Sequence, residues 1–185
     1  DSLIRAMTKL GYTYEQMADA GLVKRSSKSG RGFYDTFRNR LMFPVIDVRG
    51  NVIGFSGRIV GEGEPKYLNS PDTFVFNKSR NLFGLNIAKK SKSGRIILVE
   101  GNVDVVSLHQ AGFDSAVASL GTSLTPDQAR LMSRYAKEVV IAYDSDGAGQ
   151  KASLRAIPIL ESAGLETKVL QMTGAKDPDE YIKAK

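Results

Sequence analysis

The second half of the chain alternates short apolar runs with segments in which apolar residues recur at helical spacing. The apolar runs begin at Arg95, Ser115, Glu138 and Thr167, in the sequences R-I-I-L-V-E, S-A-V-A-S-L, E-V-V-I-A-Y-D and T-K-V-L-Q-M. This alternation predicts an α/β fold with a mostly parallel sheet, whose strands are joined by crossover helices.

Two of these helices carry start and stop signals. Thr125 is followed by a proline and, three residues on, by Gln128, which together form a capping box with proline at the first helical position. A further helix is predicted from about Gly149 to Ser162, ended by Gly164. Pro158 is expected to kink it because proline lacks a backbone N–H.

The first half has a different pattern. Two amphipathic helical segments, around Leu3 to Leu10 and Tyr14 to Ala20, each end at a glycine. A basic loop, K-R-S-S-K-S-G-R-G, follows, and then two β-rich runs flank Arg49-Gly50-Asn51, which indicates a hairpin. We predict a small basic α+β subdomain over residues 1–92 and a second domain over residues 93–185, joined near Ser91 to Gly94.

The two predicted domains differ in charge. Residues 1–92 hold sixteen Lys and Arg against eight Asp and Glu, a net charge of +8, whereas residues 93–185 hold ten against twelve, a net charge of −2. A basic module that attracts polyanions would explain this difference. A solvated basic face is the equally open alternative.

Composition narrows the class of protein. The 185 residues are 42% apolar and 25% charged, as in a soluble globular protein. There is no long apolar run and no signal-peptide pattern, so we expect no membrane span and a cytoplasmic location. The absence of cysteine and the single histidine, His109, exclude thiolate and multi-histidine metal sites. Because the chain begins with Asp1 and stops within a helical pattern, we expect a piece of a longer protein.

Acidic residues follow three of the predicted strands. In a parallel sheet, ligands bind at the carboxyl ends of the strands, so we expect these carboxylates to approach one edge. Oxygen ligands without His or Cys favour Mg²⁺, Mn²⁺ or Ca²⁺ over zinc. The six residues are Glu100, Asp104, Asp144, Asp146, Asp177 and Asp179.

Local roles for these acids remain open. The aspartates of Asp144-Ser-Asp146-Gly147 could bond nearby amides in a turn, and Asp177 could cap a helix. Asp104 could simply favour the N-terminus of its helix. An EF-hand is a poor fit, because Arg155 would stand where that loop needs an acidic ligand.

Other candidates are given weaker roles. His109 is assigned none, because nothing near it in sequence would orient its ring. Lys151 and Arg155, four residues apart on a predicted helix, are more typical of a solvated face than of a phosphate clamp. Phe33, Tyr34 and Tyr67 could stack on bases, although core packing is at least as common for such residues.

Two segments resemble the signature motifs of the TOPRIM domain, the metal-binding module of topoisomerases, primases and related nucleases. They are V-E-G-N-V-D-V-V-S-L-H-Q-A-G-F and A-Y-D-S-D-G-A-G-Q-K-A. The combination of both motifs around a parallel sheet is specific, whereas either motif alone would be weak. The resemblance implies a TOPRIM-type fold for the second domain.

The whole chain resembles the bacterial replicative primases of the DnaG type. The similarity extends over F-R-N-R-L-M-F-P-V-I-D-V-R-G-N-V-I-G-F-S-G-R, P-K-Y-L-N-S-P-D-T-F-V-F-N-K-S-R-N-L-F-G-L, A-S-L-G-T-S and K-D-P-D-E-Y-I. This resemblance implies a DNA-dependent RNA polymerase that makes short RNA primers on single-stranded DNA from ribonucleoside triphosphates. It also implies Mg²⁺, for which Mn²⁺ can substitute, and a replicative helicase as a partner through a region absent here. A helical region that usually follows the TOPRIM part is also missing, so the isolated fragment is expected to be weakly active or inactive.

The resemblance assigns roles by position. It implies that Glu100, Asp144 and Asp146 are catalytic metal ligands, and that Asp177, Asp179 and Asp104 are further acidic metal positions. Asn102 and Ser145 depart from the usual residues of the motifs without changing a ligand. The basic residues in the best-matching segments are expected to contact template or nucleotide phosphates, namely Arg38, Arg58, Lys66 and Lys78.

These residues lead to nucleotidyl transfer as the first hypothesis, in which a primer 3′-hydroxyl attacks the α-phosphate of a ribonucleotide. A TOPRIM-type nuclease, in which water attacks instead, is the second. A topoisomerase is disfavoured because no nucleophilic tyrosine is marked. A DNA-binding fragment without chemistry is the third, but crowded carboxylates without a cation would destabilise one another.

Overall fold

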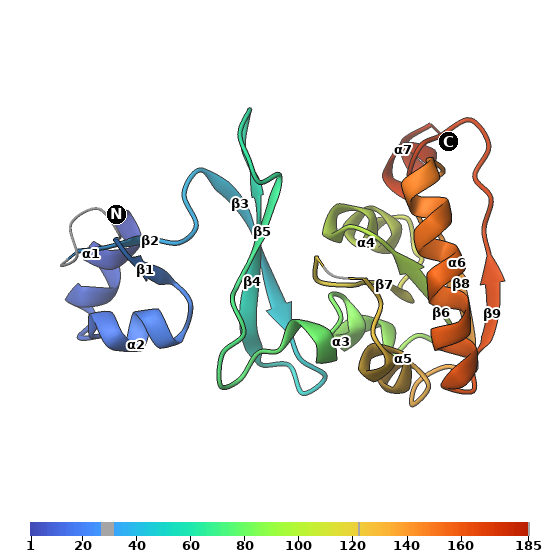
Figure 1. The fold of residues 1–185 in the computed structure, drawn as a ribbon, viewed down its shortest axis with the longest axis horizontal. Coiled ribbons are helices and arrows are strands. Elements are labelled where there is room, and N and C mark those ends of the chain that lie inside the picture. Colours follow the sequence, from blue (N-terminus) through green and yellow to red (C-terminus); the bar gives the residue numbers. More distant parts are fainter. Residues whose placement is uncertain (27–31, 122, 185) are drawn as a thin grey trace. The chain divides into compact units, whose positions relative to one another are not determined.

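The computed structural model describes residues 1–26, 32–121 and 123–184 (Figure 1). Part of the predicted basic loop, residues 27–31, and one residue of the A-S-L-G-T-S segment, residue 122, lie outside these ranges. The chain divides into two compact units, Asp1–Pro44 with Ile53–Asn77, and Val45–Val52 with Lys78–Lys185. Residues 78–92 belong to the second unit, so this division falls earlier in the chain than the composition change at Ser91.

The first unit begins with two helices and a hairpin. Helices α1 (Ser2–Lys9) and α2 (Tyr14–Asp19) are followed by antiparallel strands β1 (Val23–Arg25) and β2 (Phe33–Asp35). Both predicted helices are confirmed. Each ends near a glycine with positive φ, a conformation that L side chains rarely adopt.

A small core holds these elements together. Ile4, Met17 and Val23 are buried against one another. The buried carboxylate of Asp35 accepts hydrogen bonds from the N–H groups of Leu3 (3.0 Å) and Ile4 (3.1 Å). Asp35 therefore satisfies two of the free donors at the N-terminus of α1.

A three-stranded sheet follows, with the order β3-β4-β5. Its strands are β3 (Arg40–Ile46), β4 (Val52–Ile59) and β5 (Tyr67–Asn69). The predicted hairpin is confirmed: Asp47 accepts hydrogen bonds from the N–H groups of Arg49 (2.8 Å) and Asn51 (2.9 Å) across the turn.

The second unit is built on a four-stranded sheet with the order β7-β6-β8-β9, in which every neighbouring pair is parallel. Its strands are β6 (Arg95–Val99), β7 (Ala116–Ala118), β8 (Glu138–Ile141) and β9 (Glu166–Val169). The predicted parallel sheet is confirmed. Strand β9 ends earlier than predicted because its partner β8 ends at Ile141, whose carbonyl accepts a hydrogen bond from the N–H of Leu170.

Helices cover both faces of this sheet (Figure 1). Ile96 and Leu98 of β6 belong to the core that also contains Leu160, whereas Val99 packs with Val105 on the opposite face. The first face is covered by α3 (Leu85–Ala88), α5 (Pro126–Met132) and α6 (Gly147–Ser162), and the second by α4 (Asn102–Gln110) and α7 (Pro178–Lys183). A short 3-10 helix, η1 (Lys78–Arg80), precedes α3.

Two helix predictions can be compared in detail. The capping box of α5 is present, since Thr125 and Gln128 each accept a hydrogen bond from the backbone of the other. Helix α6 begins two residues before the predicted start and continues through Pro158, the site of the expected kink. Within the described residues, no helix has both the length and the apolar character needed to cross a membrane.

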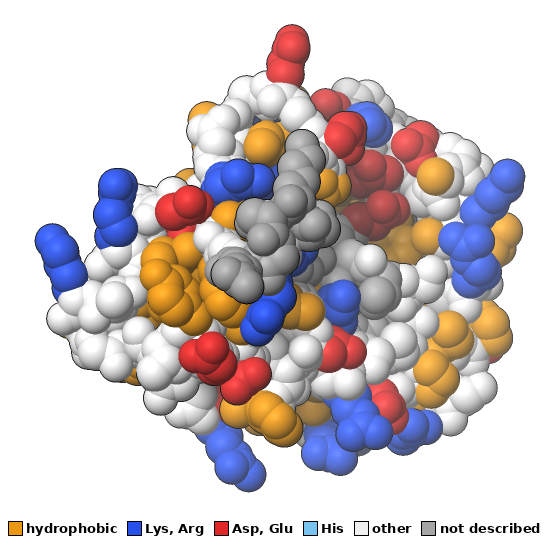
Figure 2. Space-filling view, turned by 60° about the vertical axis from the view of Figure 1, so that its left-hand side comes forward, with side chains coloured by type: hydrophobic (Ala, Val, Ile, Leu, Met, Phe, Trp, Pro, Cys, Tyr) orange, Lys and Arg blue, Asp and Glu red, His pale blue; other side chains and the backbone are white. Residues whose placement is uncertain are grey.

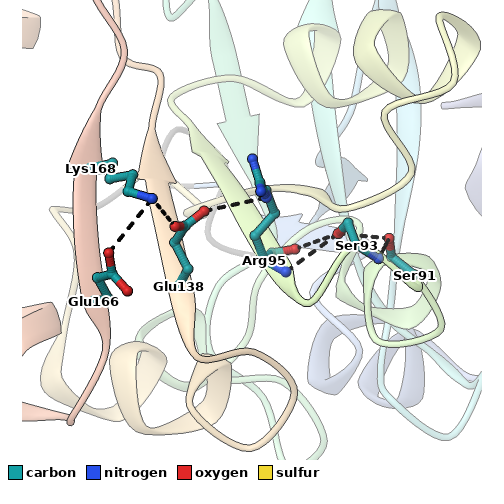
Figure 3. A network of polar contacts seen from close by, with 6 residues as sticks. All are labelled: Ser91, Ser93, Arg95, Glu138, Glu166 and Lys168. Atoms are coloured by element: carbon teal, nitrogen blue, oxygen red, sulfur yellow. Dashed lines mark hydrogen bonds and ion pairs between the residues drawn. The ribbon is translucent and has the colours of Figure 1, made fainter.

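Polar contacts join the amino ends of three strands (Figure 3). Glu138 begins β8 and accepts contacts from Arg95 of β6, at 3.3 Å, and from Lys168 of β9. Lys168 also lies 3.6 Å from Glu166. These charges lie at the edge of the sheet opposite to the carboxyl ends of the strands.

Candidate functional site

The carboxyl ends of β6 and β8 lie side by side at the centre of the sheet. The chain leaves β6 toward β7 on one side, and leaves β8 toward β9 on the other, so the two strands border the point where the strand order reverses. Ligands of open α/β sheets bind outside such a point. Glu100 directly follows β6, and Tyr143 and Asp144 follow β8.

A hydrogen bond joins these two strand ends. The N–H of Asp144 donates to Oε1 of Glu100 at 3.3 Å. Partial desolvation and the nearby Asp144 carboxylate raise the pKa of Glu100, and Asp146 adds to this effect. The predicted approach of Glu100 to the D-S-D segment is therefore confirmed, and it concentrates negative charge.

Asp146 has a local role as well. Its carboxylate accepts hydrogen bonds from the N–H groups of Ala148 (3.0 Å) and Gly149 (2.9 Å), so it is the N-cap of α6. These bonds, with a contribution from Lys176, lower the pKa of Asp146 against a smaller opposing effect of burial. The turn role that the sequence left open is thus present, and it keeps this carboxylate ionised.

Gly149 is fixed by the same turn. A Cβ atom at this position would lie 2.1 Å from the carbonyl oxygen of Asp144 and 3.0 Å from Oε1 of Glu100. Only glycine therefore permits the close approach of α6 to both strand ends.

A second acidic group surrounds the start of α4. Asp104 is buried, and its Oδ2 accepts a hydrogen bond of 3.1 Å from the N–H of Gly101. Burial, followed by the charges of Asp177 and Asp144, raises the pKa of Asp104 to about 6. The carboxylates after β6, β8 and β9 are therefore close enough to interact, as predicted from their positions at the strand ends.

Asp177 and Asp179 are held by α7. Asp177 caps this helix, since its carboxylate accepts a hydrogen bond of 2.8 Å from the N–H of Glu180. Asp179 accepts hydrogen bonds from the hydroxyl of Ser107 in α4 and from Lys183, at 2.7 Å. The helix-cap role left open for Asp177 is confirmed, and Asp179 ties α7 to α4.

Sequence reasoning missed two residues of this region. The N–H of Ser145 donates to the carbonyl of Lys176 at 2.8 Å, and its hydroxyl lies 3.0 Å from the carbonyls of Ala175 and Lys176. Lys176 lowers the pKa of both Glu100 and Asp146. The position of Lys176 as the first residue of the K-D-P-D-E segment was the available signal. Ser145, noted as a departure from glycine, links the two loops.

The oxygen donors are suited to a hard divalent cation, because they are carboxylates that repel one another. With the side chains as they stand, no group of three or more His, Cys, Asp or Glu in the described part of the chain is arranged to hold an ion. A cation bound by Glu100, Asp144 and Asp146 would therefore require their side chains to turn toward it.

The predicted basic residues lie in both units. Arg38, Arg58 and Lys66 are in the first unit, and Lys78 is in η1 of the second. The guanidinium of Arg38 lies 5.0 Å from the ring centre of Tyr34. Figure 2 shows exposed Lys and Arg side chains in the described part of the chain.

Two further candidate residues, Phe33 and His109, have contacts that the sequence did not indicate. Phe33 stacks on Tyr14, with ring centres 5.2 Å apart. The Nε2 atom of His109 lies 2.9 Å from the carbonyl oxygen of Ala116, which joins α4 to β7. The fold thus supplies a partner that orients the His109 ring, although no nearby sequence signal indicated one, and the absence of a catalytic role for His109 stays a prediction.

Two family models match the chain. The model described as the N-terminal domain of the DNA primase catalytic core matches residues 1–89. The model described as Toprim-like matches residues 97–182. The short segment between the two matches, residues 90–96, is not matched, and neither are residues 183–185.

Individual proteins match over nearly the whole chain. The DNA primase of Clostridium acetobutylicum is 50% identical over 182 residues, which are 98% of this chain and 30% of that protein. The crystal structure of the zinc-binding and RNA polymerase domains of the Aquifex aeolicus primase has a TM-score of 0.90 and 42% identity, and covers 99% of this chain and 45% of that one. The structure of the DnaG primase catalytic domain bound to ssDNA has a TM-score of 0.85 and 39% identity, and covers 96% of this chain and 57% of that one. The chain thus spans about a third of the length of this curated relative.

Proposed function

Because the chain belongs to the family of DnaG-type DNA primase catalytic cores, with the N-terminal domain and the Toprim domain of that core, we propose that it joins ribonucleotides into short RNA primers on a single-stranded DNA template. The 3′-hydroxyl oxygen of the growing primer forms a bond to the α-phosphorus of a ribonucleoside triphosphate, and pyrophosphate leaves.

The observation that carries this proposal is the pairing of Glu100 with the backbone of Asp144 across two adjacent strand ends. This pairing brings together the acidic residues that the Toprim resemblance singles out. It does so at the edge of the parallel sheet where ligands of open α/β sheets bind. The repulsion that helps to raise the pKa of Glu100 would be relieved by a cation in this group.

We assign Mg²⁺ to Glu100, Asp144 and Asp146, with Asp104, Asp177 and Asp179 as a second acidic group beside it. When bound, this ion would neutralise charge on phosphate oxygens. Asp146 remains ionised because its backbone bonds lower its pKa. Lys176 supplies positive charge to the same group and is suited to offset part of the carboxylate repulsion.

We further propose that the basic residues of each unit bind phosphates of the nucleic acid or the nucleotide. The related catalytic domain bound to ssDNA makes single-stranded DNA the expected template. Arg38 is exposed beside an aromatic ring, a combination that suits contact with both phosphate and base. The residues assigned to phosphates are Arg38, Arg58, Lys66 and Lys78.

The test is primer synthesis by a complete primase that carries this chain as its catalytic core. Glu100→Gln and Asp144→Asn remove charge with little change of shape, and each is expected to reduce synthesis on the order of 10²-fold or more. Glu161→Gln, at an exposed position of α6, is the matched control and should leave synthesis unchanged.

Full synthesis by both variants would overturn the proposal. Cleavage of the template strand by the wild-type enzyme, without extension of a primer, would instead indicate a nuclease. Template and labelled ribonucleotide supplied together distinguish these results, since extension and cleavage change product length in opposite directions.

A further inference from the structure

Ser145 stands between Asp144 and Asp146 and joins two loops that both carry acidic residues. Its N–H donates to the carbonyl of Lys176 at 2.8 Å, and its hydroxyl lies 3.0 Å from the carbonyls of Ala175 and Lys176. One residue therefore ties the loop after β8 to the segment that enters α7. Because glycine, the usual residue at this position of the motif, has no hydroxyl, the hydroxyl contacts belong to this chain and not to the motif.

The segment from residue 171 to residue 176 depends on this tie. Strand β9 ends at Val169, and the N–H of Leu170 makes the last bond to β8. Gly174 has a φ of 84°, and a Cβ atom there would meet nothing within 4 Å, so the segment is loosely packed at this point. In the described chain, the hydrogen bonds that join residues 171–176 to elements other than α7 come from Ser145. Ser145 is therefore the polar contact that fixes this segment relative to the end of β8.

Like charges act against the same contact. Burial raises the pKa of Asp104, and the charges of Asp177, directly after the segment, and of Asp144, directly before Ser145, raise it further. The carboxylates of the two loops are thus close enough to the same group to act on it together. A segment that was not tied would move outward and reduce this repulsion. The bonds of Ser145 oppose that movement and keep the carboxylates together before a cation binds.

We propose that Ser145 is a positioning residue, whose hydroxyl holds the acidic residues after β9 at a fixed distance from those after β6 and β8. The inference rests on the proposed function, which assigns Mg²⁺ to the first acidic group with the second beside it, and adds a residue that sets the strength of cation binding. A site that is already held in its binding geometry binds more tightly, because less conformational freedom is lost on binding.

Three variants separate the hydroxyl from other features of the position. Ser145→Ala removes the hydroxyl and keeps the backbone N–H, and should weaken the binding of a divalent cation by about three- to tenfold, as for one lost hydrogen bond. Ser145→Thr keeps the hydroxyl and should retain the wild-type affinity. Ser162→Ala is the matched control, because the hydroxyl of Ser162 also donates to a carbonyl, that of Pro158 at 2.6 Å, but at the other end of α6.

The first experiment uses Mn²⁺ alone as the probe. Mn²⁺ is titrated into the 185-residue chain and its three variants, and the free ion is measured by electron paramagnetic resonance. Weaker binding is expected in Ser145→Ala only. Wild-type affinity in Ser145→Ala, or an equal loss in Ser145→Thr or Ser162→Ala, would overturn the inference.

The positioning itself is tested without metal. The ¹H–¹⁵N heteronuclear NOE of residues 171–176 should be lower in Ser145→Ala than in the wild type, because the segment gains motion when the tie is weakened. The NOE of the loop at residues 111–114, before β7, should be the same in both. Unchanged values for residues 171–176 would overturn the inference.

The Mg²⁺ dependence of primer synthesis by a complete primase completes the test. In Ser145→Ala, the half-saturating Mg²⁺ concentration should rise by the same factor as the Mn²⁺ dissociation constant, and the rate at saturating Mg²⁺ should stay near the wild-type rate. A lower saturating rate with unchanged half-saturation would overturn the inference, since Ser145 would then act on the chemistry or the overall fold. These outcomes are distinct from failure of the proposed function, which is decided by Glu100→Gln and Asp144→Asn.

Discussion

The N–H of Asp144 donates a hydrogen bond of 3.3 Å to Oε1 of Glu100, so the chain emerging from β8 is tied to the chain emerging from β6. Helix α6 begins immediately after this contact, and its first turn is packed against both residues at Gly149. The position of the two carboxylates therefore depends on a glycine that carries no chemistry itself.

Gly149→Ala is expected to disrupt this arrangement. The new methyl carbon would lie 2.1 Å from the carbonyl oxygen of Asp144, a backbone atom that cannot move without shifting the strand end. We expect the free energy of unfolding to fall by about 3 kcal/mol or more, as for severe overpacking. Urea unfolding followed by circular dichroism measures this change.

Gly147→Ala is the matched control, two residues earlier in the same helix. A Cβ atom there would meet nothing within 4 Å, so the substitution should leave stability unchanged or slightly higher. Equal losses in the two variants would contradict the account, because they would reflect the general effect of replacing glycine at a helix start.

Much of the arrangement around Glu100 and Asp144 can be predicted from the sequence, because it depends on the order of strands and helices along the chain. The alternation of apolar runs predicts the parallel sheet, and the acids directly after β6 and β8 are placed at its carboxyl edge by connectivity alone. Two contacts could not be predicted in this way: the hydrogen bond from the hydroxyl of Ser107 to Asp179, and the contact of the His109 ring with the carbonyl of Ala116. Each joins two elements whose separation is determined only by how they pack.

Asp104 should make stability depend on pH. Burial and neighbouring carboxylates raise its pKa from 3.8 to about 6, so between these values the folded state retains a proton that the unfolded state has lost. Folding stability contributed by this group therefore falls as pH rises through that window, and stays lower above it. In the absence of divalent ions, Asp104→Asn should exceed the wild type in stability at neutral pH by roughly 1–3 kcal/mol.

Urea unfolding at a series of pH values tests this expectation. The difference between Asp104→Asn and wild type should disappear near pH 4, where both folded proteins carry an uncharged side chain at this position. Asp114→Asn, in the loop before β7, provides an exposed control. A difference in unfolding free energy that stayed constant at all pH values would show that the effect comes from packing and not from the titration of Asp104.

Glu138 links three strands at the opposite edge of the sheet (Figure 3). Its hydrogen bond and charge interaction with Lys168, aided by Arg95, lower its pKa, so its contribution to stability is present at neutral pH and is lost as pH falls through the folded-state pKa. Glu138→Gln should lower the melting temperature, and the decrease should shrink in high salt.

Glu166→Gln serves as the comparison, because Glu166 is 68% exposed and lies 3.6 Å from the same lysine. It should change the melting temperature less than Glu138→Gln does, since an exposed pair is screened by water. Neither substitution should alter nucleotide binding, because both residues lie at the amino ends of the strands. An equal effect of the two substitutions on melting would argue against a special role of Glu138.

Two arginines of the first unit are expected to have different roles, Arg40 in stability and Arg58 in binding. Arg40 donates hydrogen bonds to the carbonyls of Gly57 (3.0 Å) and Pro65 (2.9 Å), so Arg40→Ala should lower the free energy of unfolding by roughly 1–2 kcal/mol. Arg58, on β4 opposite Tyr67, is assigned to phosphate. Arg58→Ala should weaken binding to single-stranded DNA and reduce the slope of log affinity against log salt by about 0.7, the value for one lost phosphate contact on a single strand. Fluorescence anisotropy with a labelled oligonucleotide at several salt concentrations measures this slope, and a slope that changes in Arg40→Ala but not in Arg58→Ala would reverse the assignment.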